Sequence, residues 1–286
     1  MPNGSHASHA LVTPDPGRSV FRRMIRYLDR LAKDTRAENV HRFRTNSRRV
    51  EALVADLAPE SGNKRKLLKL LSKLRKSAGK LRDLDVQIAF LKELKVYDRQ
   101  NHRAQLLAAL VEEQAQRSRK LAKSFTAGRV RELRKRLRRA QSEITLDGID
   151  PLRSAFGHLP PPAPNPPTEK TLHAYRIRAK HARYLAELAA DSEEARSFVA
   201  ELKRAQDEIG RWHDMLKLSE RARELFGDVH DSALVSLVEN MRRASFRRAV
   251  KAMLTAMEAV SRLRDRRARA RTGAAPQIAR AQSAAA

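Results

Sequence analysis

Two short segments of the chain, VHRFRTNSRR at 40–49 and LHAYRIRAKHAR at 172–183, carry histidine and basic residues at the same helical spacing. At about 100° per residue, these side chains gather in a stripe along one side of a helix. The stripes consist of His41, Arg44 and Arg48, with Arg49 beside them, in the first segment and of His173, Arg176, Lys180 and Arg183 in the second. Arginine offers a planar fork of donors and lysine a mobile point charge, so such a row can bind the oxygens of an anionic chain.

A second pair of matching segments follows the stripes at nearly the same distance, AGKLRDLDV at 78–86 and IGRWHDMLK at 209–217. Asp83 and Asp214 occupy equivalent positions in this pair, and we expect them to hold neighbouring arginines or to cap helices that begin after the glycines. An ordinary solvated helix face could explain any one of the cations, but not the same set twice in register. The repeated order indicates an internal duplication, which would bring both stripes to one groove about a pseudo-two-fold axis.

A further cationic helix is predicted at 63–83, where lysines recur every three or four residues and leave leucines for the core. Its counterpart in the second half of the chain is less basic. These segments add more candidate anion-binding residues: Lys73, Lys76, Lys80 and Arg82 from the first half, and Lys203 and Arg211 from the second.

The elements that must position these residues are predicted to be helices, because apolar residues recur at helical spacing and sustained period-two alternation is absent from the sequence. We expect helices of roughly 15–25 residues. Turns or kinks between them are expected at Gly62, Gly79, Gly128, Gly210 and Gly227. The predicted fold is all-α, with two four-helix-bundle-like halves related by internal duplication.

Composition sets the predicted boundaries of the two halves. The segment LPPPAPNPP cannot continue a helix and should form a linker. Both ends of the chain have too few apolar side chains to pack, so they are expected to be disordered. The predicted order is a disordered N-terminus at 1–17, a first helical half at 18–158, a linker at 159–167, a second helical half at 168–271 and a disordered tail at 272–286.

The 286-residue chain is strongly basic, since 60 Lys and Arg against 33 Asp and Glu give a formal net charge of +27. Such a charge destabilises the compact state by self-repulsion unless a polyanionic partner relieves it.

The chain has no cysteine, which excludes disulfides and thiolate metal sites and fits a reducing compartment. No apolar run approaches the roughly 20 residues of a membrane span, and the N-terminus lacks the pattern of a secretory signal. We therefore expect a cytoplasmic protein without a membrane partner.

Taken together, the two pairs of segments resemble the CHAD family, named for its conserved histidine α-helical domain, over about residues 20–260. The resemblance implies two four-helix bundles related by pseudo-two-fold symmetry, with a basic central groove or pore that binds inorganic polyphosphate. The resemblance also suggests association with polyphosphate granules. We expect no catalysis and no cofactor. We assign polyphosphate binding to the stripe residues and to the further cations named above.

Polyphosphate has no bases to recognise, so charge and hydrogen bonds to phosphate oxygens must provide its recognition. Neighbouring cations should keep His41 and His173 neutral in the free protein, whereas a bound polyanion should favour their charged forms. Affinity should therefore rise as the pH falls.

Non-specific binding of DNA or RNA is the main alternative, because a net charge of +27 also attracts nucleic-acid phosphates. Aromatic residues make up only 5 % of the chain and sit among core-spaced apolar residues, so base stacking is not expected. Nucleic acid should bind only as a weak electrostatic background.

An enzyme of the His-Asp phosphohydrolase type is a weaker alternative, because the His-Asp dipeptides in WHDM and VHDS arise easily by chance. The other histidines, His102, His158 and His230, show no ligand spacing, and no metal site is predicted.

Overall fold

The computed structural model describes residues 16–146, 148–159, 167–189 and 191–273, and these residues form helices joined by turns, without a strand among them. This confirms the all-α prediction for the described residues. The helices are α1 (Pro16–Lys33), α2 (Ala37–Leu57), α3 (Gly62–Glu93), α4 (His102–Ser124), α5 (Ala127–Glu143), α6 (Pro151–Gly157), α7 (Glu169–Ala186), the short 3-10 helix η1 (Glu187–Ala189), α8 (Glu193–Phe226) and α9 (Ala233–Gly273).

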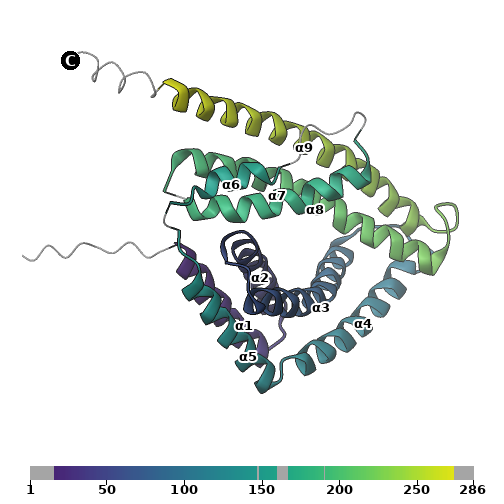
Figure 1. Ribbon diagram of the computed structural model, residues 1–286. Coiled ribbons are helices and arrows are strands. Elements are labelled where there is room, and N and C mark those ends of the chain that lie inside the picture. The colour runs from purple at the N-terminus through teal and green to yellow at the C-terminus, as the bar shows by residue number, and fades with distance from the viewer. Residues whose placement is uncertain (1–15, 147, 160–166, 190, 274–286) are drawn as a thin grey trace, which may run out of the picture.

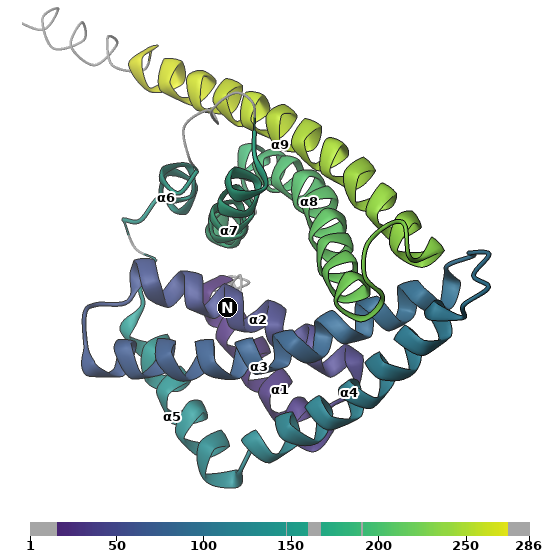
Figure 2. The ribbon, with the colours of Figure 1, turned by 90° about the vertical axis from the view of Figure 1, so that its right-hand side faces the viewer.

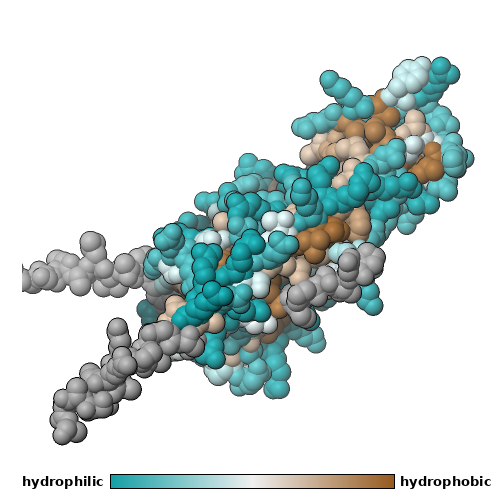
Figure 3. Space-filling model, turned by 90° about the horizontal axis from the view of Figure 1, so that it is seen from above, coloured by the Kyte–Doolittle hydropathy of each residue, from teal (hydrophilic) through white to brown (hydrophobic). Residues whose placement is uncertain are grey.

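Helices α1–α5 lie on one side of the molecule and α6–α9 on the other, as the two perpendicular views show (Figures 1 and 2). Near the centre α2 contacts α7, and farther along α3 and α4 contact α8. The long helix α9 packs along α8 on the outside. The face seen from above is mostly hydrophilic, with hydrophobic side chains showing in a few patches (Figure 3).

Three clusters of buried apolar side chains hold the helices together. The first lies among α1, α2, α5 and the first part of α3, and the second lies among α6–α9. The third cluster joins the two groups, because it combines the last part of α3 and the start of α4 with the last part of α8 and the start of α9. Burial of apolar surface contributes about 25 cal/mol per Å², so this shared cluster helps to hold the two groups of helices together.

Gly79 and Gly210 lie inside long helices instead of between shorter ones. Helix α3 has 32 residues and α8 has 34, so the predicted length of roughly 15–25 residues is wrong for these helices, and neither glycine is a turn between shorter helices. A glycine costs only about 1 kcal/mol in a helix interior, which good helix formers and packing on both sides can offset. Gly62 and Gly128 lie in the first turns of α3 and α5, and Gly227 ends α8 with a φ of 79°.

Helix α6 packs with the second group of helices, although the sequence places it before the proline-rich segment. Leu152 and Phe156 are buried in the second cluster. The predicted boundary at 159–167 therefore falls inside this group, because a proline-rich segment can join two packed helices as well as two domains. Residues 160–166 of that segment lie outside the described residues.

The predicted disordered ends, 1–17 and 272–286, lie almost entirely outside the described residues. At their inner edges, α1 begins at Pro16 and α9 continues to Gly273. Within the described part of the chain, none of the helices combines the length and the apolar content that a membrane crossing requires.

Candidate functional site

Helix α2 packs its apolar face into the first cluster and turns its basic stripe toward α7. Phe43 and Val50 are fully buried, whereas Arg44 and Arg48 are only partly buried. The charges of Arg44 and Arg48 act on the ammonium of Lys180 in α7. The two stripes recognised in the sequence therefore meet where α2 contacts α7.

Arg44 is anchored between α2 and α3. Its Nη1 donates to the Gly79 carbonyl oxygen at 3.2 Å and to Asp83 Oδ1 at 3.4 Å. A Cβ added at Gly79 would make ordinary contact with the guanidinium at 3.6 Å, so this group lies directly against α3. Burial and the charge of Arg48 lower the pKa of Arg44 to about 10, while Asp83 acts in the opposite direction. Asp83 thus holds an arginine, as predicted, and the alternative of a helix cap is wrong because Asp83 lies inside α3.

Arg176 and Asp214 form a corresponding pair of charges in α7 and α8. Burial, followed by the charge of Arg48, lowers the pKa of Arg176, and Asp214 opposes this shift. Burial raises the pKa of Asp214, although the charge of Arg176 opposes it. The Nε of Arg176 is buried and lacks a hydrogen-bond partner among the described residues. This guanidinium therefore has donor capacity that the protein does not use.

Lys180 is the most perturbed cation of the two stripes. Burial, followed by the charges of Arg48 and Arg176, lowers the pKa of Lys180 to about 6. In the described part of the chain, Lys180, Arg48 and Arg176 make neither an ion pair nor a hydrogen bond to a protein acceptor. The pKa of Lys180 therefore lies close to neutral pH, and a bound anion would favour the protonated form of its amine.

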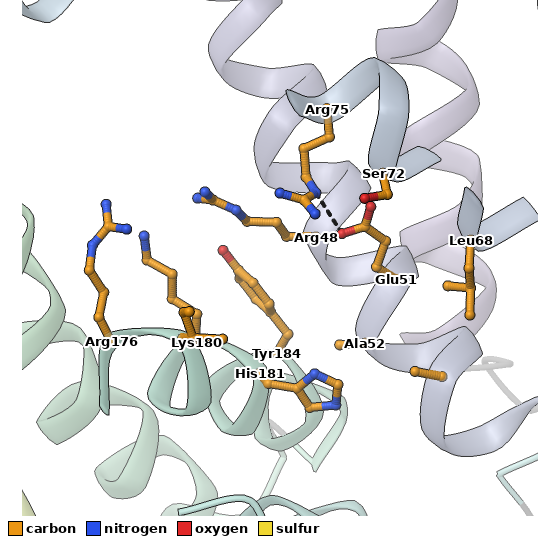
Figure 4. A pocket seen from close by; sticks show the side chains of 12 residues that line it. Arg48, Glu51, Ala52, Leu68, Ser72, Arg75, Arg176, Lys180, His181 and Tyr184 are labelled. Atoms are coloured by element: carbon orange, nitrogen blue, oxygen red, sulfur yellow. Dashed lines mark hydrogen bonds and ion pairs between the residues drawn. The ribbon is translucent and has the colours of Figure 1, made fainter. Parts of the chain in front are cut away.

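These three cations line one cavity of about 450 Å³, here called the α2–α7 pocket. Figure 4 shows Arg48 reaching into it from α2, and Arg176 and Lys180 pointing into the same space from α7. On the α3 side the wall carries an ion pair in which Arg75 Nε donates to Glu51 Oε2 at 2.6 Å. The remaining lining residues are Ala52, Ala55, Leu68, Ser72, Ile177, His181 and Tyr184.

Two other stripe residues, Arg49 and Arg183, share one carboxylate. Arg49 Nε donates to Glu187 Oε2 at 2.7 Å, and Arg183 Nε lies 3.7 Å from Glu187 Oε1. Both guanidinium groups also lie over the ring of Tyr184, at 5.7 and 4.9 Å from its centroid. Glu187 compensates part of their charge, so they hold α2 and α7 together and contribute less to an unpaired cationic surface.

The stripe histidines His41 and His173 are exposed at the surface. Protein atoms around the ring and the charge of Arg82 lower the pKa of His41, in the direction expected for a histidine among cations. The ring centroid of His173 lies 6.0 Å from that of His213, a half-buried residue of α8. Burial and the charge of Arg176 lower the pKa of His213 to about 3, so this ring is neutral at physiological pH.

The candidate lysines of α3, Lys73, Lys76 and Lys80, are all exposed. Lys80 lines a second cavity, of about 300 Å³, between α3, α4 and α8, where Glu113 and Glu224 balance part of the positive charge. Lys76 is close enough to act on Glu51 in the wall of the α2–α7 pocket. These lysines therefore extend the positive surface outward from that pocket.

Lys203 and Arg211 are not brought to the α2–α7 pocket. Both are exposed on α8, and Arg211 pairs with Glu208 beside a separate surface cavity between α8 and α9. Their assignment as ligands has the least structural support of the predicted set.

The pocket also contains residues that the sequence reasoning missed. Leu68, Ser72 and Arg75 line it from α3, and Tyr184 and His181 line it from α7. The spacing of the three α3 residues, at i, i+4 and i+7, could have placed them on one helix face. Which partner that face meets depends on the packing of α3, α2 and α7.

A family model for the CHAD domain matches residues 18–223. Two solved structures are similar to the chain. One is the CHAD domain from the plant Ricinus communis, with a TM-score of 0.59, 17 % identity and coverage of 86 % of this chain and 90 % of that one. The other is PptA from Streptomyces chartreusis, with a TM-score of 0.56, 15 % identity and coverage of 87 % and 97 %. No curated protein matches the chain.

Proposed function

The chain belongs to the CHAD domain family, and from this premise we propose that it binds inorganic polyphosphate in and around the α2–α7 pocket without catalysing a reaction on it. By this proposal the protein is cytoplasmic and associates with polyphosphate granules. We also propose that the two halves are products of an internal duplication. In this proposal α4 and α5 of the first half together correspond to the single helix α9 of the second. Their lengths support the correspondence, because α4 and α5 have 23 and 17 residues and α9 has 41.

The observation that carries the proposal is the convergence of Arg48, Arg176 and Lys180 on one pocket without protein acceptors. Burying a charge is costly unless a partner of opposite sign compensates it. In each stripe some cations form ion pairs, as Arg44 does with Asp83 in the first stripe and Arg183 does with Glu187 in the second. The cations that form no ion pair or hydrogen bond to a carboxylate among the described residues are therefore the ones suited to an external anion.

The chemistry of the pocket fits a chain of phosphates. Guanidinium groups bind two oxygens at once, while a lysine follows oxygens that rotate. The exposed lysines of α3 can attract further phosphates of the same chain, so a polymer would be bound more tightly than a single phosphate. His41 and His173 lie at the exposed ends of the stripes, where they can add hydrogen bonds.

Non-specific nucleic-acid binding remains the alternative function. The net charge of +27 favours it. However, Phe43, Trp212 and Tyr184 are at most 4 % exposed, so the aromatic rings nearest the stripes cannot stack on bases. We propose that nucleic acid binds only as a weak, salt-sensitive background.

A competition titration tests the proposal. Long-chain polyphosphate and single-stranded DNA, matched for total charge, compete for the protein at near-physiological salt. The test variant is Arg48→Gln/Arg176→Gln, and the matched control is Arg119→Gln/Lys120→Gln, which removes two exposed charges from α4. Each charge-assisted hydrogen bond contributes about 1.5–3 kcal/mol, so the test variant should bind polyphosphate about 100-fold more weakly or worse.

The control variant should lose only a few-fold in affinity, and wild-type protein should prefer polyphosphate to DNA. Equal loss in both variants would mean that overall charge, and not the pocket, determines binding. Equal affinity for the two polymers would favour the nucleic-acid alternative.

A further inference from the structure

A cluster of two histidines and one aspartate lies beside the α2–α7 pocket. It consists of Asp56 in α2, His158 directly after α6 and His181 in α7. His158 Nε2 lies 2.5 Å from Asp56 Oδ2, and His181 Nε2 lies 3.1 Å from Asp56 Oδ1. The two imidazole rings are 4.1 Å apart between centroids. One ligand atom from each residue lies within 4.8 Å of the others, and this is the one such group among the described residues.

We propose that Asp56, His158 and His181 bind a divalent transition-metal ion, with Zn²⁺ as the best-suited ion. Two imidazole nitrogens and one carboxylate oxygen are ligands that zinc prefers, and they leave a fourth position open in a tetrahedral site. Hard ions such as Mg²⁺ favour oxygen ligands and keep several waters, so they should not compete.

The geometry requires only small movements to admit the ion. With metal–ligand bonds of about 2.1 Å, the ligand atoms of a tetrahedral site lie about 3.4 Å apart. The two distances observed from the aspartate to the histidines are shorter than this, as expected when hydrogen bonds hold the groups together. Binding would replace the shared protons with the ion and open the contacts by less than about 1 Å.

The cluster can be reached from solvent and borders the α2–α7 pocket. The side chain of Asp56 is 18 % exposed and that of His181 is 28 % exposed, so the ion could enter from solvent without crossing the core. His181 also lines the α2–α7 pocket, and Figure 4 shows its ring at the edge of that pocket next to Tyr184. The ion would therefore lie near one end of the row of cations.

A bound ion would also fasten the two groups of helices to each other. Asp56 belongs to the first group, whereas His158 follows α6 and His181 lies in α7 of the second. The ion would tie α2 to the end of α6 and to α7, and it would oppose separation of α2 from α7. The metal proposal does not rest on polyphosphate binding, because its three ligands are not among the cations assigned to polyphosphate, although His181 borders the same pocket.

Spacing in the sequence does not reveal this site. Asp56 is 102 residues from His158 and 125 from His181, so the motif that normally signals a zinc site is absent. The absence of a predicted metal site therefore reflects the limits of sequence spacing.

Metal binding is tested on tag-free, full-length protein after treatment with a chelator. All proteins carry His6→Ala/His9→Ala, so that N-terminal histidines cannot contribute. Isothermal titration with Zn²⁺ should show one site per chain, and Zn²⁺ but not Mg²⁺ should raise the melting temperature. Co²⁺, which substitutes for Zn²⁺, should give the visible absorption bands of a tetrahedral site.

The variants His158→Ala and His181→Ala should each lose at least about 100-fold in Zn²⁺ affinity, since even changes outside the ligand shell cost 10–100-fold. His230→Ala changes an exposed histidine in the turn between α8 and α9; it is the matched control and should bind normally. Circular dichroism checks that each variant is folded. Zn²⁺ binding that is equal in all three variants would overturn the proposal. The absence of tetrahedral Co²⁺ bands in the parent protein would also overturn the proposal, and this result does not depend on whether the variants fold. In either case the three residues would serve only as a hydrogen-bonded contact between helices.

Discussion

Replacing Lys180 by methionine should stabilise the protein at neutral pH and weaken its binding of polyphosphate. Lysine has an ordinary pKa of 10.5, and burial among Arg48, Arg176, Arg44 and Arg183 lowers the pKa of Lys180 to about 6 in the folded protein. Between these values the unfolded chain binds a proton that the folded protein does not. Proton binding therefore favours the unfolded state, and stability rises with pH throughout this window.

The size of the effect follows from the distance between pH 7 and the unfolded pKa. Each pH unit corresponds to about 1.4 kcal/mol, and the gap from pH 7 to 10.5 is 3.5 units, so the penalty at pH 7 is about 5 kcal/mol. Methionine has a similar shape and does not titrate. We expect Lys180→Met to raise the free energy of unfolding at pH 7 by about 2–5 kcal/mol, where the lower limit allows for water that reaches the ammonium through the pocket.

Urea unfolding at pH 6, 7, 8, 9 and 10 measures this effect, with the exposed Lys203→Met as the matched control. The difference between Lys180→Met and wild type should be largest near pH 6 and shrink by about 1.4 kcal/mol per unit above pH 7. The control should change stability little at any pH. A Lys180→Met variant that is no more stable than wild type at pH 7, or a difference independent of pH, would refute the idea of a destabilised buried ammonium.

The same variant also separates lysine from histidine in the pH dependence of binding. A bound polyanion favours the charged ammonium, so wild-type affinity should rise as the pH falls from 8 to 6. If Lys180 is the titrating group, Lys180→Met should lose this rise, whereas His41→Gln/His173→Gln should keep it. The opposite result would assign the pH dependence to the histidines.

Two further substitutions test the surrounding structure. Gly79→Ala should stabilise α3 by up to about 1 kcal/mol, because alanine has the higher helix propensity and its Cβ would make ordinary contact with Arg44 at 3.6 Å. Gly79→Leu should displace that guanidinium and destabilise the fold. Thermal unfolding of both variants distinguishes these outcomes. Hydrogen bonds, chiefly from Arg242, lower the pKa of the buried Glu239 to about 2 from its ordinary 4.5. Its stabilising effect is therefore complete above pH 4.5 and lost as the pH falls toward 2. Glu239→Gln should destabilise by about 1–3 kcal/mol at pH 7 but less at pH 3, and equal destabilisation at both pH values would contradict this assignment.

Local patterns were sufficient to predict the helices and the faces that they present. The spacing that buries Phe43 and Val50 in α2 also turns Arg44 and Arg48 outward, because a helix of regular pitch relates the two faces. The same local reasoning fails at Gly79, because α3 continues through this glycine for 32 residues and packing of the helix offsets the glycine's weak helix propensity. Contacts between helices are not visible in the propensity of one residue.

The sequence by itself determined that the chain is helical, strongly basic and provided with two matching cationic stripes. Only the tertiary structure decided which of those cations are neutralised and which are left without partners. Glu187 is 138 residues from Arg49 in the sequence, so spacing does not pair them, and the carboxylate reaches Arg49 only across the contact between α2 and α7. Packing likewise buries Lys180 among arginines and gathers Asp56 with two distant histidines. The physical reason is that charge interactions and burial depend on distances through space, which the chain acquires only when its helices pack.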